Sequence, residues 1–348
     1  MKKIAVLLII SIVFSACKGN EEDTVDNVGS QWSIPLTNVF EGGVGIDGIP
    51  SLTNPNFIDA NDAEADFISD TDLVIGYKNG DDVRAYSHSI LDWHEIINDN
   101  IGNVSVAITY CPLTGSGIGW SRIVDGNETS FGVSGLLYNN NLILYDRQTR
   151  SNWSQLLNTS VNGSLIGTNS EVIPLVETTW KAWKTLYPNS KVVSKDTGFS
   201  RDYNASPYSD YSTDNNLLFF PVFQDTRLPL KERVHSILLD NRAKVYQFSS
   251  FESNNVIRDA FQGAEYIIIG NEEFIVSFRL EGETSALNFE YVYNNSEAIL
   301  VDNEGNSWNI FGEAIAGPRI GQRLSSSNSF MAYWFSVPAF YPTEIFGE

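Results

Sequence analysis

The sequence predicts an α+β to mainly β fold, made of two fused pseudo-repeats of antiparallel strands with short helices. Two observations predict it. Short apolar runs, rich in aromatic residues, are separated by Asn, Asp, Ser and Gly, which is typical of strands joined by turns. In addition, the second half of the chain repeats short segments of the first half in the same order. A length of 348 residues suits two domains or one large duplicated domain.

The repeat is visible in pairs of segments. Val83-Arg84-Ala85-Tyr86 returns as Ala243-Lys244-Val245-Tyr246, and Tyr187-Pro188 returns as Tyr341-Pro342. The spacing between paired segments shortens slightly along the chain, as expected of a duplication followed by a few loop deletions. We therefore expect the two halves to fold alike.

The elements of the first half follow from its sequence pattern. Residues 73–77 and 83–86 are predicted to form a hairpin, because Asn79-Gly80 between them favours a tight turn. Residues 89–98 are predicted to form a short helix, since apolar residues recur there at helical spacing. Residues 104–111 alternate between apolar and polar or small residues, as strands do.

Further strands at 118–124, 130–134 and 142–145 and a helix at 180–187 follow, and residues 197–220 have no counterpart in the second half. We expect residues 197–220 to link the repeats. The expected organisation is a lipoprotein signal with its lipidated cysteine (1–17), a flexible tether and lead-in (18–46), a first repeat with the candidate site and linker (47–226), and a degenerate second repeat (227–348).

The N-terminus is predicted to be an export signal. Met1-Lys2-Lys3 is basic, and residues 4–14 are apolar but too few to span a bilayer as a helix. Ser15-Ala16-Cys17 follows, which resembles a bacterial lipoprotein signal and implies lipidation of Cys17. The alternative is an ordinary cleaved signal with an incidental cysteine. The acidic residues that follow are similar to the surface-export signals of Bacteroidota lipoproteins.

This leader predicts an outer-membrane lipoprotein of the cell envelope, exposed at the surface, whose partner is the membrane through its lipid anchor. The formal net charge of −21 argues against nucleic acid as a partner, because such binding depends on Lys and Arg neutralising phosphates. With Cys17 lipidated, Cys111 is the only free thiol, so no disulfide can form within the chain.

Three long segments resemble one protein family. They are Trp93-His94-Glu95-Ile96-Ile97-Asn98-Asp99, Thr109-Tyr110-Cys111-Pro112-Leu113-Thr114-Gly115-Ser116-Gly117, and the run from Phe131 to Gln155. They are similar to the bacterial domain-of-unknown-function family numbered 3179, and the resemblance covers roughly residues 47 to 347. It implies an envelope protein whose activity is unassigned.

The sequence departs from the family pattern at Thr114. Members of that family commonly carry a second cysteine at this position, in a Cys-x-x-Cys loop, and some carry selenocysteine. The resemblance therefore implies thiol redox chemistry for the family. Thr114 argues against dithiol exchange in this chain, because no resolving thiol remains.

The candidate catalytic residues are Cys111, His94, Arg147 and Asp146. Cys111 stands opposite Asn271 in the second half, His94 opposite Asn254 and Arg147 opposite Asn303, whereas Asp146 is retained as Asp302. This asymmetric loss predicts one site in the first repeat, where Cys111, His94 and Arg147 line one cavity and the thiol pKa falls towards 7. The simpler alternatives are an inert buried cysteine, a core histidine and a turn-capping aspartate.

Two function classes remain open. The first is a thiol-based site at Cys111, redox or nucleophilic, with His94 as base. The second is a lipid-anchored binding or scaffold module with a structural cysteine, whose partner is an unknown small molecule or envelope protein. A soft-metal site for copper or zinc formed by Cys111, His94 and His88 is a weaker alternative, because no segment has metal-ligand spacing. No cofactor is predicted.

Overall fold

The computed structural model describes residues 31–348 except 220, 222 and 295. The predicted signal, Cys17 and the tether up to residue 30 lie outside these residues. The described part contains two α-helices, α1 (His88–His94) and α2 (Trp180–Leu186). It also contains five 3-10 helices, which are η1 (Leu36–Asn38), η2 (Ala63–Phe67), η3 (Phe248–Phe251), η4 (Gly282–Ala286) and η5 (Trp334–Ser336).

Most of the described chain is β-structure. The strands before residue 194 are β1 (Val39–Glu41), β2 (Leu52–Thr53), β3 (Phe57–Asp59), β4 (Leu73–Asn79), β5 (Asp82–Ser87), β6 (Ile96–Ile101), β7 (Val104–Cys111), β8 (Ser116–Ser121), β9 (Ile123–Val124), β10 (Asn127–Glu128), β11 (Phe131–Tyr138), β12 (Asn141–Asp146), β13 (Asn152–Ser154), β14 (Thr159–Asn162), β15 (Val172–Ile173), β16 (Val176–Thr179) and β17 (Lys191–Val193).

The strands after residue 232 are β18 (Arg233–Leu239), β19 (Arg242–Gln247), β20 (Val256–Phe261), β21 (Ala264–Gly270), β22 (Ile275–Leu280), β23 (Phe289–Tyr291), β24 (Ala298–Asp302), β25 (Ser307–Asn309), β26 (Ala314–Ala316), β27 (Ser325–Ser326), β28 (Ser329–Tyr333) and β29 (Thr343–Ile345). The predicted mainly β class, with antiparallel sheets and short helices, is confirmed. None of the described helices is long and apolar enough to cross a membrane.

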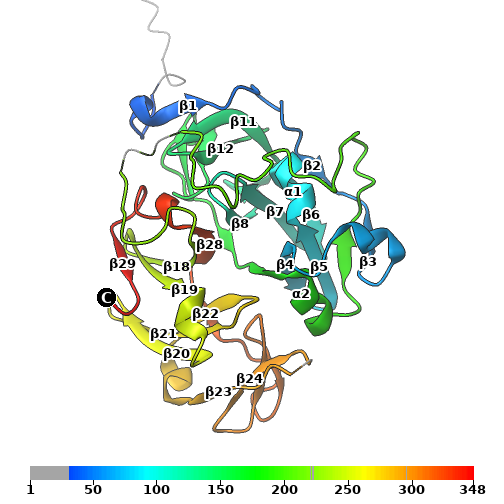
Figure 1. Cartoon of the computed structure of the whole chain (residues 1–348), viewed down its shortest axis with the longest axis vertical. Helices are drawn as coiled ribbons and strands as arrows, with labels where there is room; N and C mark the ends of the chain where they lie inside the picture. The colour runs from blue at the N-terminus through cyan, green and yellow to red at the C-terminus, as the bar shows by residue number, and fades with distance from the viewer. Residues whose placement is uncertain (1–30, 220, 222, 295) are drawn as a thin grey trace, which may run out of the picture.

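Figure 1 shows β11 and β12 of the first half at the top of the view and β20 to β24 of the second half at the bottom. The sheets of the two halves have matching strand orders, with one extra edge strand in each sheet of the first half. The order β16-β4-β5-β17-β3 corresponds to β28-β18-β19-β29, and β15-β8-β7-β6-β2 corresponds to β27-β22-β21-β20. The third sheet, β1-β11-β12-β13-β14, corresponds to β23-β24-β25-β26. Even the parallel pairs agree, since β17 pairs with β5 and β29 with β19 in parallel. This agreement supports the expected duplication, and the domain boundaries themselves stay predictions.

Equivalent side chains make equivalent contacts in the two halves. The Tyr86 hydroxyl donates to Asp99 over 2.7 Å, and the Tyr246 hydroxyl donates to Asp259 over 2.9 Å. In each half a cation completes the group: Arg84 lies beside Asp99 and Lys244 beside Asp259.

The halves also share a core. One cluster of buried side chains combines first-half tryptophans with residues of β28 and the turn after it, including Trp120, Trp153, Phe330, Trp334 and Phe335. Because hydrophobic burial scales with the apolar area removed from water, each half depends on the other for a large part of its burial.

The predicted helix over residues 89–98 is wrong in its second part. α1 ends at His94, Glu95 has a φ of 55°, and the chain continues as β6. The β-branched Ile96 and Ile97 fit the pleated strand, where both are buried. The apolar spacing that predicted a longer helix therefore came from two different elements.

The segment between β17 and β18 has no helix or strand in its described residues, as expected of a linker. It nevertheless packs on the first half. Tyr203 and Tyr211 are buried, and the indole of Trp93 donates to the carbonyl of Ala205 over 3.0 Å. The linker therefore forms part of the wall of the cavities described below.

Candidate functional site

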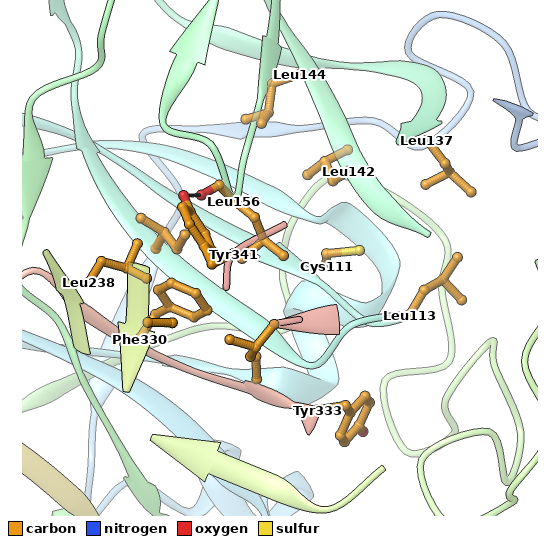
Figure 2. Close-up of a cluster of buried hydrophobic side chains, with 14 of the residues drawn as sticks. Cys111, Leu113, Leu137, Leu142, Leu144, Leu156, Leu238, Phe330, Tyr333 and Tyr341 are labelled. Carbon is orange, nitrogen blue, oxygen red and sulfur yellow. Dashed lines mark hydrogen bonds between the residues drawn. The ribbon is translucent and has the colours of Figure 1, made fainter. Parts of the chain in front are cut away.

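Cys111 lies at the end of β7 inside the shared core (Figure 2), with an exposed fraction of 1%. Leu113, Leu137 and Leu142 surround it (Figure 2). The Cys111 thiol donates to the carbonyl of Asn140 over 3.6 Å. Burial, followed by the negative charge of Glu95, raises the thiol pKa to about 11. The expected fall of this pKa towards 7 is therefore wrong, and the thiol is neutral at pH 7.

Thr114 occupies the turn directly after β7. Its backbone N–H donates to the carbonyl of Cys111 over 3.2 Å. Its hydroxyl lies 2.8 Å from the Ser116 hydroxyl and accepts from the Asn141 amide over 3.0 Å. The position where the resemblance implied a second cysteine thus holds a buried hydroxyl with hydrogen bonds of its own.

His94, at the end of α1, is held by two partners. Its Nδ1 lies 2.7 Å from the carbonyl of Pro50, and its Nε2 lies 2.7 Å from the Tyr203 hydroxyl. A carbonyl can only accept, so Nδ1 carries the proton and Nε2 accepts from Tyr203. Burial lowers the pKa of His94, which keeps the ring neutral.

Arg147 forms a bidentate ion pair with Asp47. Its two terminal nitrogens lie 2.9 and 2.8 Å from the two carboxylate oxygens of Asp47. The Tyr145 hydroxyl donates to the same carboxylate over 2.6 Å. The pair fixes the segment before β2 against β12.

Asp146 stabilises the turn after β12. Its carboxylate accepts from the Thr149 backbone N–H over 2.6 Å and from the Trp153 indole over 3.1 Å. Asp302 accepts from the Trp308 indole over 2.8 Å in the same way. This shared geometry matches the turn-capping alternative for Asp146.

His88 is buried beside two charged groups. Its Nε2 lies 3.2 Å from Glu177, whose other oxygen pairs with Arg233. Burial, and then the charge of Arg233, lowers the pKa of His88 to about 3. In the described part of the chain, no group of three His, Cys, Asp or Glu side chains could hold a metal ion. The proposed ligands His88, His94 and Cys111 do not form such a group.

The predicted site residues therefore have separate partners. The structure does not bring Cys111, His94 and Arg147 into one cavity, because His94 and Arg147 are engaged by the segment 47–50 and the thiol is enclosed by leucines. Their catalytic roles stay predictions.

Glu95, which connects α1 to β6, has an unusual environment among the described residues. It has a left-handed backbone conformation with a φ of 55°, which is uncommon for a residue with a side chain and is found preferentially at functional sites. It is 6% exposed, and no Lys or Arg pairs with it in the described residues. Its carboxylate accepts from the Tyr208 hydroxyl over 3.0 Å. Burial raises the pKa of Glu95 to about 7.

Glu95 forms the polar end of an apolar pocket of about 260 Å³. The pocket is otherwise lined by the leucines beside Cys111, by further residues of β11, and by two covering segments. These are residues 42–49 and the part of the linker with Tyr208, Leu218 and Phe219. A concave apolar site with one buried ionisable group is the arrangement expected of a binding site for a small molecule.

The predicted residues hold the covering segments in place. Arg147 binds Asp47 within residues 42–49, and His94 binds both Pro50 and Tyr203 of the linker. Close backbone contact adds to this: the Gly42 N–H donates to the Gly135 carbonyl over 2.7 Å, and a side chain at Gly135 would collide with the Gly45 carbonyl. Arg147 and His94 therefore bond to residues within or next to the covering segments, while Asp47, Pro50 and Tyr203 themselves do not line the pocket.

A family model described as "Protein of unknown function (DUF3179)" matches residues 46–344. The chain belongs to this family. The match spans both halves of the fold, the Cys111 loop and Glu95. No curated protein matches the chain. No solved structure matches it either.

Family membership in DUF3179 assigns no activity, so the site rests on its own geometry. Sequence analysis did not select Glu95, although the same comparison of halves could have done so. Asn255 stands opposite Glu95 in the second half. The backbone carbonyl of Glu95 accepts from the Tyr110 N–H, and the backbone carbonyl of Asn255 accepts from the Gly270 N–H in the equivalent way. The loss of a carboxylate in the second half was the available signal.

Proposed function

We propose that this chain is a lipid-anchored envelope protein that binds a small, mainly apolar molecule in the Glu95 pocket. The observation that carries the proposal is a buried carboxyl group that lines a leucine-rich pocket and has no cationic partner among the described residues. Leaving a carboxylate in such a place costs stability unless a ligand or a proton satisfies it. Because Glu95 lowers stability at this position, its presence is better explained by a function such as ligand binding.

The pocket defines the chemistry of its ligand. An apolar body fits against Leu113, Leu137 and Leu142, and a volume of about 260 Å³ limits that body to a small molecule. The head of the ligand meets Glu95. Because the pKa of Glu95 is about 7, its carboxyl group donates to an acceptor at lower pH and pairs with a cationic or donor head at higher pH.

Binding of an apolar fluorophore tests this proposal. N-phenyl-1-naphthylamine should bind the unlipidated chain that begins at residue 18, which keeps every described residue. Leu218 lines the pocket and is 61% exposed, so Leu218→Asp should weaken binding at least tenfold without disturbing the core. The matched control is Ile320→Asp, at a 68% exposed apolar side chain outside the pocket. Equal binding of the fluorophore by Leu218→Asp and Ile320→Asp would show that the fluorophore does not bind in this pocket.

The membrane anchor is a separate part of the proposal and rests on Ser15-Ala16-Cys17. Several buried acyl chains give stable anchoring, since each buried methylene contributes about 0.8 kcal/mol. Cys17→Ala should release the protein from the membrane fraction and abolish fatty-acid labelling. Unchanged retention and labelling would contradict the lipoprotein proposal.

Thiol chemistry at Cys111 is the second candidate function. The observation that favours it is that Leu113, Leu137 and Leu142 belong to the same buried cluster as Cys111 and also line the pocket. A raised thiol pKa argues against an activated nucleophile. In this second proposal Cys111 reacts only with a ligand already bound in the pocket, so labelling by an apolar thiol reagent should depend on an open pocket.

A further inference from the structure

A second and larger cavity lies where the two halves and the linker meet. Its volume is about 660 Å³, within the range of known ligand sites. Tyrosines from three parts of the chain line it: Tyr110 from β7, Tyr333 from β28, and Tyr203, Tyr208 and Tyr211 from the linker. Their rings give the cavity flat aromatic walls, which can stack against a ligand.

Two of these tyrosines have free hydrogen-bonding groups. Tyr110 and Tyr333 are each 5% exposed, and their hydroxyls have no hydrogen-bond partner among the described residues. Arg233 also lines the cavity, and its buried Nε has no acceptor in the described part of the chain. A buried donor without a partner costs roughly 1–3 kcal/mol, so the Nε of Arg233 indicates a ligand that accepts a hydrogen bond. The two tyrosine hydroxyls line the same cavity and can bond to that ligand as well.

The same cavity also presents acceptors. The carboxylates of Asp66, Asp72 and Asp92 line it, and none of them forms an ion pair with Lys or Arg in the described residues. Asp92 accepts from the Ser206 hydroxyl over 2.8 Å, and Asp72 accepts from a backbone N–H over 2.8 Å. Each carboxylate retains oxygen lone pairs for a further donor.

The mixture of groups selects one class of ligand. An anion would meet three carboxylates, while the one guanidinium is already paired with Glu177. An organic cation would leave the hydroxyls of Tyr110 and Tyr333 and the Nε of Arg233 without acceptors. A neutral ligand with many hydroxyl groups satisfies both donors and acceptors and stacks on tyrosine rings. We propose that the cavity between Tyr110, Tyr333, Asp92 and Arg233 binds a neutral carbohydrate.

The test is a binding titration of the full chain in a detergent without a sugar headgroup. The probes are a panel of neutral disaccharides built from hexoses, pentoses and N-acetylhexosamines, with tetramethylammonium chloride and inorganic phosphate as the charged probes. We expect saturable binding of at least one disaccharide. Tyr110→Phe and Tyr333→Phe each remove only a hydroxyl without a protein partner, so both should fold and weaken binding about three- to tenfold.

The matched control is Tyr266→Phe, at a buried tyrosine of β21 that does not line the cavity, and it should bind as the wild type does. Glu95→Gln should also leave disaccharide binding intact, so a failure of the apolar pocket and a failure of this cavity are distinguishable. The proposal is overturned if tetramethylammonium or phosphate binds while no disaccharide does, if no probe binds, or if Tyr110→Phe and Tyr333→Phe bind the disaccharide as Tyr266→Phe does.

Discussion

At the scale of single residues, the account depends on the proton of Glu95. Its pKa is about 7 in the folded protein against an ordinary value of 4.5. Between these pH values the folded state binds more protons than the unfolded state. Glu95 therefore lowers the free energy of unfolding as pH rises through this range, by about 3 kcal/mol in total.

Glu95→Gln removes this titration while retaining an acceptor for Tyr208. Relative to the wild type, the variant should gain about 3 kcal/mol in free energy of unfolding between pH 4.5 and pH 8, measured by urea unfolding. Glu252→Gln, at an exposed carboxylate, is the control and should show no such gain. A constant difference between Glu95→Gln and wild type across this pH range would mean that Glu95 has an ordinary pKa.

Cys111 provides a second prediction at this scale. Because burial raises its pKa to about 11, alkylation by iodoacetamide in the folded protein should be slow at pH 7 and should rise only above about pH 9. His94→Ala should leave this midpoint unchanged, since His94 bonds to Pro50 and Tyr203. If alkylation of Cys111 instead had a midpoint near pH 7, and His94→Ala raised that midpoint, the hypothesis of an activated thiol would be supported.

At the scale of elements, the covering segment of residues 42–49 forms a strap that lines the Glu95 pocket. Its N–H groups at Gly42 and Asp47 donate to β11, and Arg147 holds the Asp47 carboxylate. Such a partly exposed ion pair contributes about 0.2–1 kcal/mol. The strap is thus held by a few weak contacts.

Arg147→Ala should loosen the strap without unfolding the protein. We expect the amides of Gly42 and Asp47 to exchange hydrogen about two- to fivefold faster, while those of β7 keep their protection. Arg279→Ala, which removes a guanidinium 3.5 Å from Glu281 in the second half, is the control. Unchanged exchange at both amides of Arg147→Ala would show that the ion pair does not hold the strap.

The elements differ in how far sequence could predict them. Alternation and turn residues located the hairpin of β4 and β5 and the strand β7, because both signals are local. The end of α1 was missed, since apolar side chains of β6 continued the helical spacing. The strap and the linker carry no periodic signal, so their places over the pocket depend on tertiary contacts alone.

At the scale of the whole molecule, we expect the two halves to fold as one unit. The shared cluster places Trp334 and Phe330 of the second half with Trp120 of the first. We expect residues 227–348 alone to lack a cooperative unfolding transition, and mixing them with residues 31–226 to restore it, by circular dichroism and tryptophan fluorescence. A cooperative transition for the isolated second half would show that the shared cluster is dispensable.

Sequence comparison of the halves identified the region of the pocket but did not select Glu95. Asymmetric loss pointed to His94 and Arg147, which bond to Pro50 and Asp47, and passed over Glu95, which lines the pocket. The missing information was burial: a carboxylate beside a helix end looks solvated in sequence, and only the packing of Tyr208 and the leucines makes it unusual.

The central claim, that Glu95 forms the polar end of a ligand pocket, is tested most directly by competition with octylamine and octanol. Both should displace N-phenyl-1-naphthylamine. Octylamine stays cationic below about pH 9, since alkyl ammonium groups resemble that of Lys with a pKa of about 10.4. As Glu95 ionises, the affinity of octylamine relative to octanol should rise between pH 5 and pH 9 with a midpoint near 7, and Glu95→Gln should abolish that rise. A relative affinity that does not change with pH, or that changes equally in Glu95→Gln, would contradict the account.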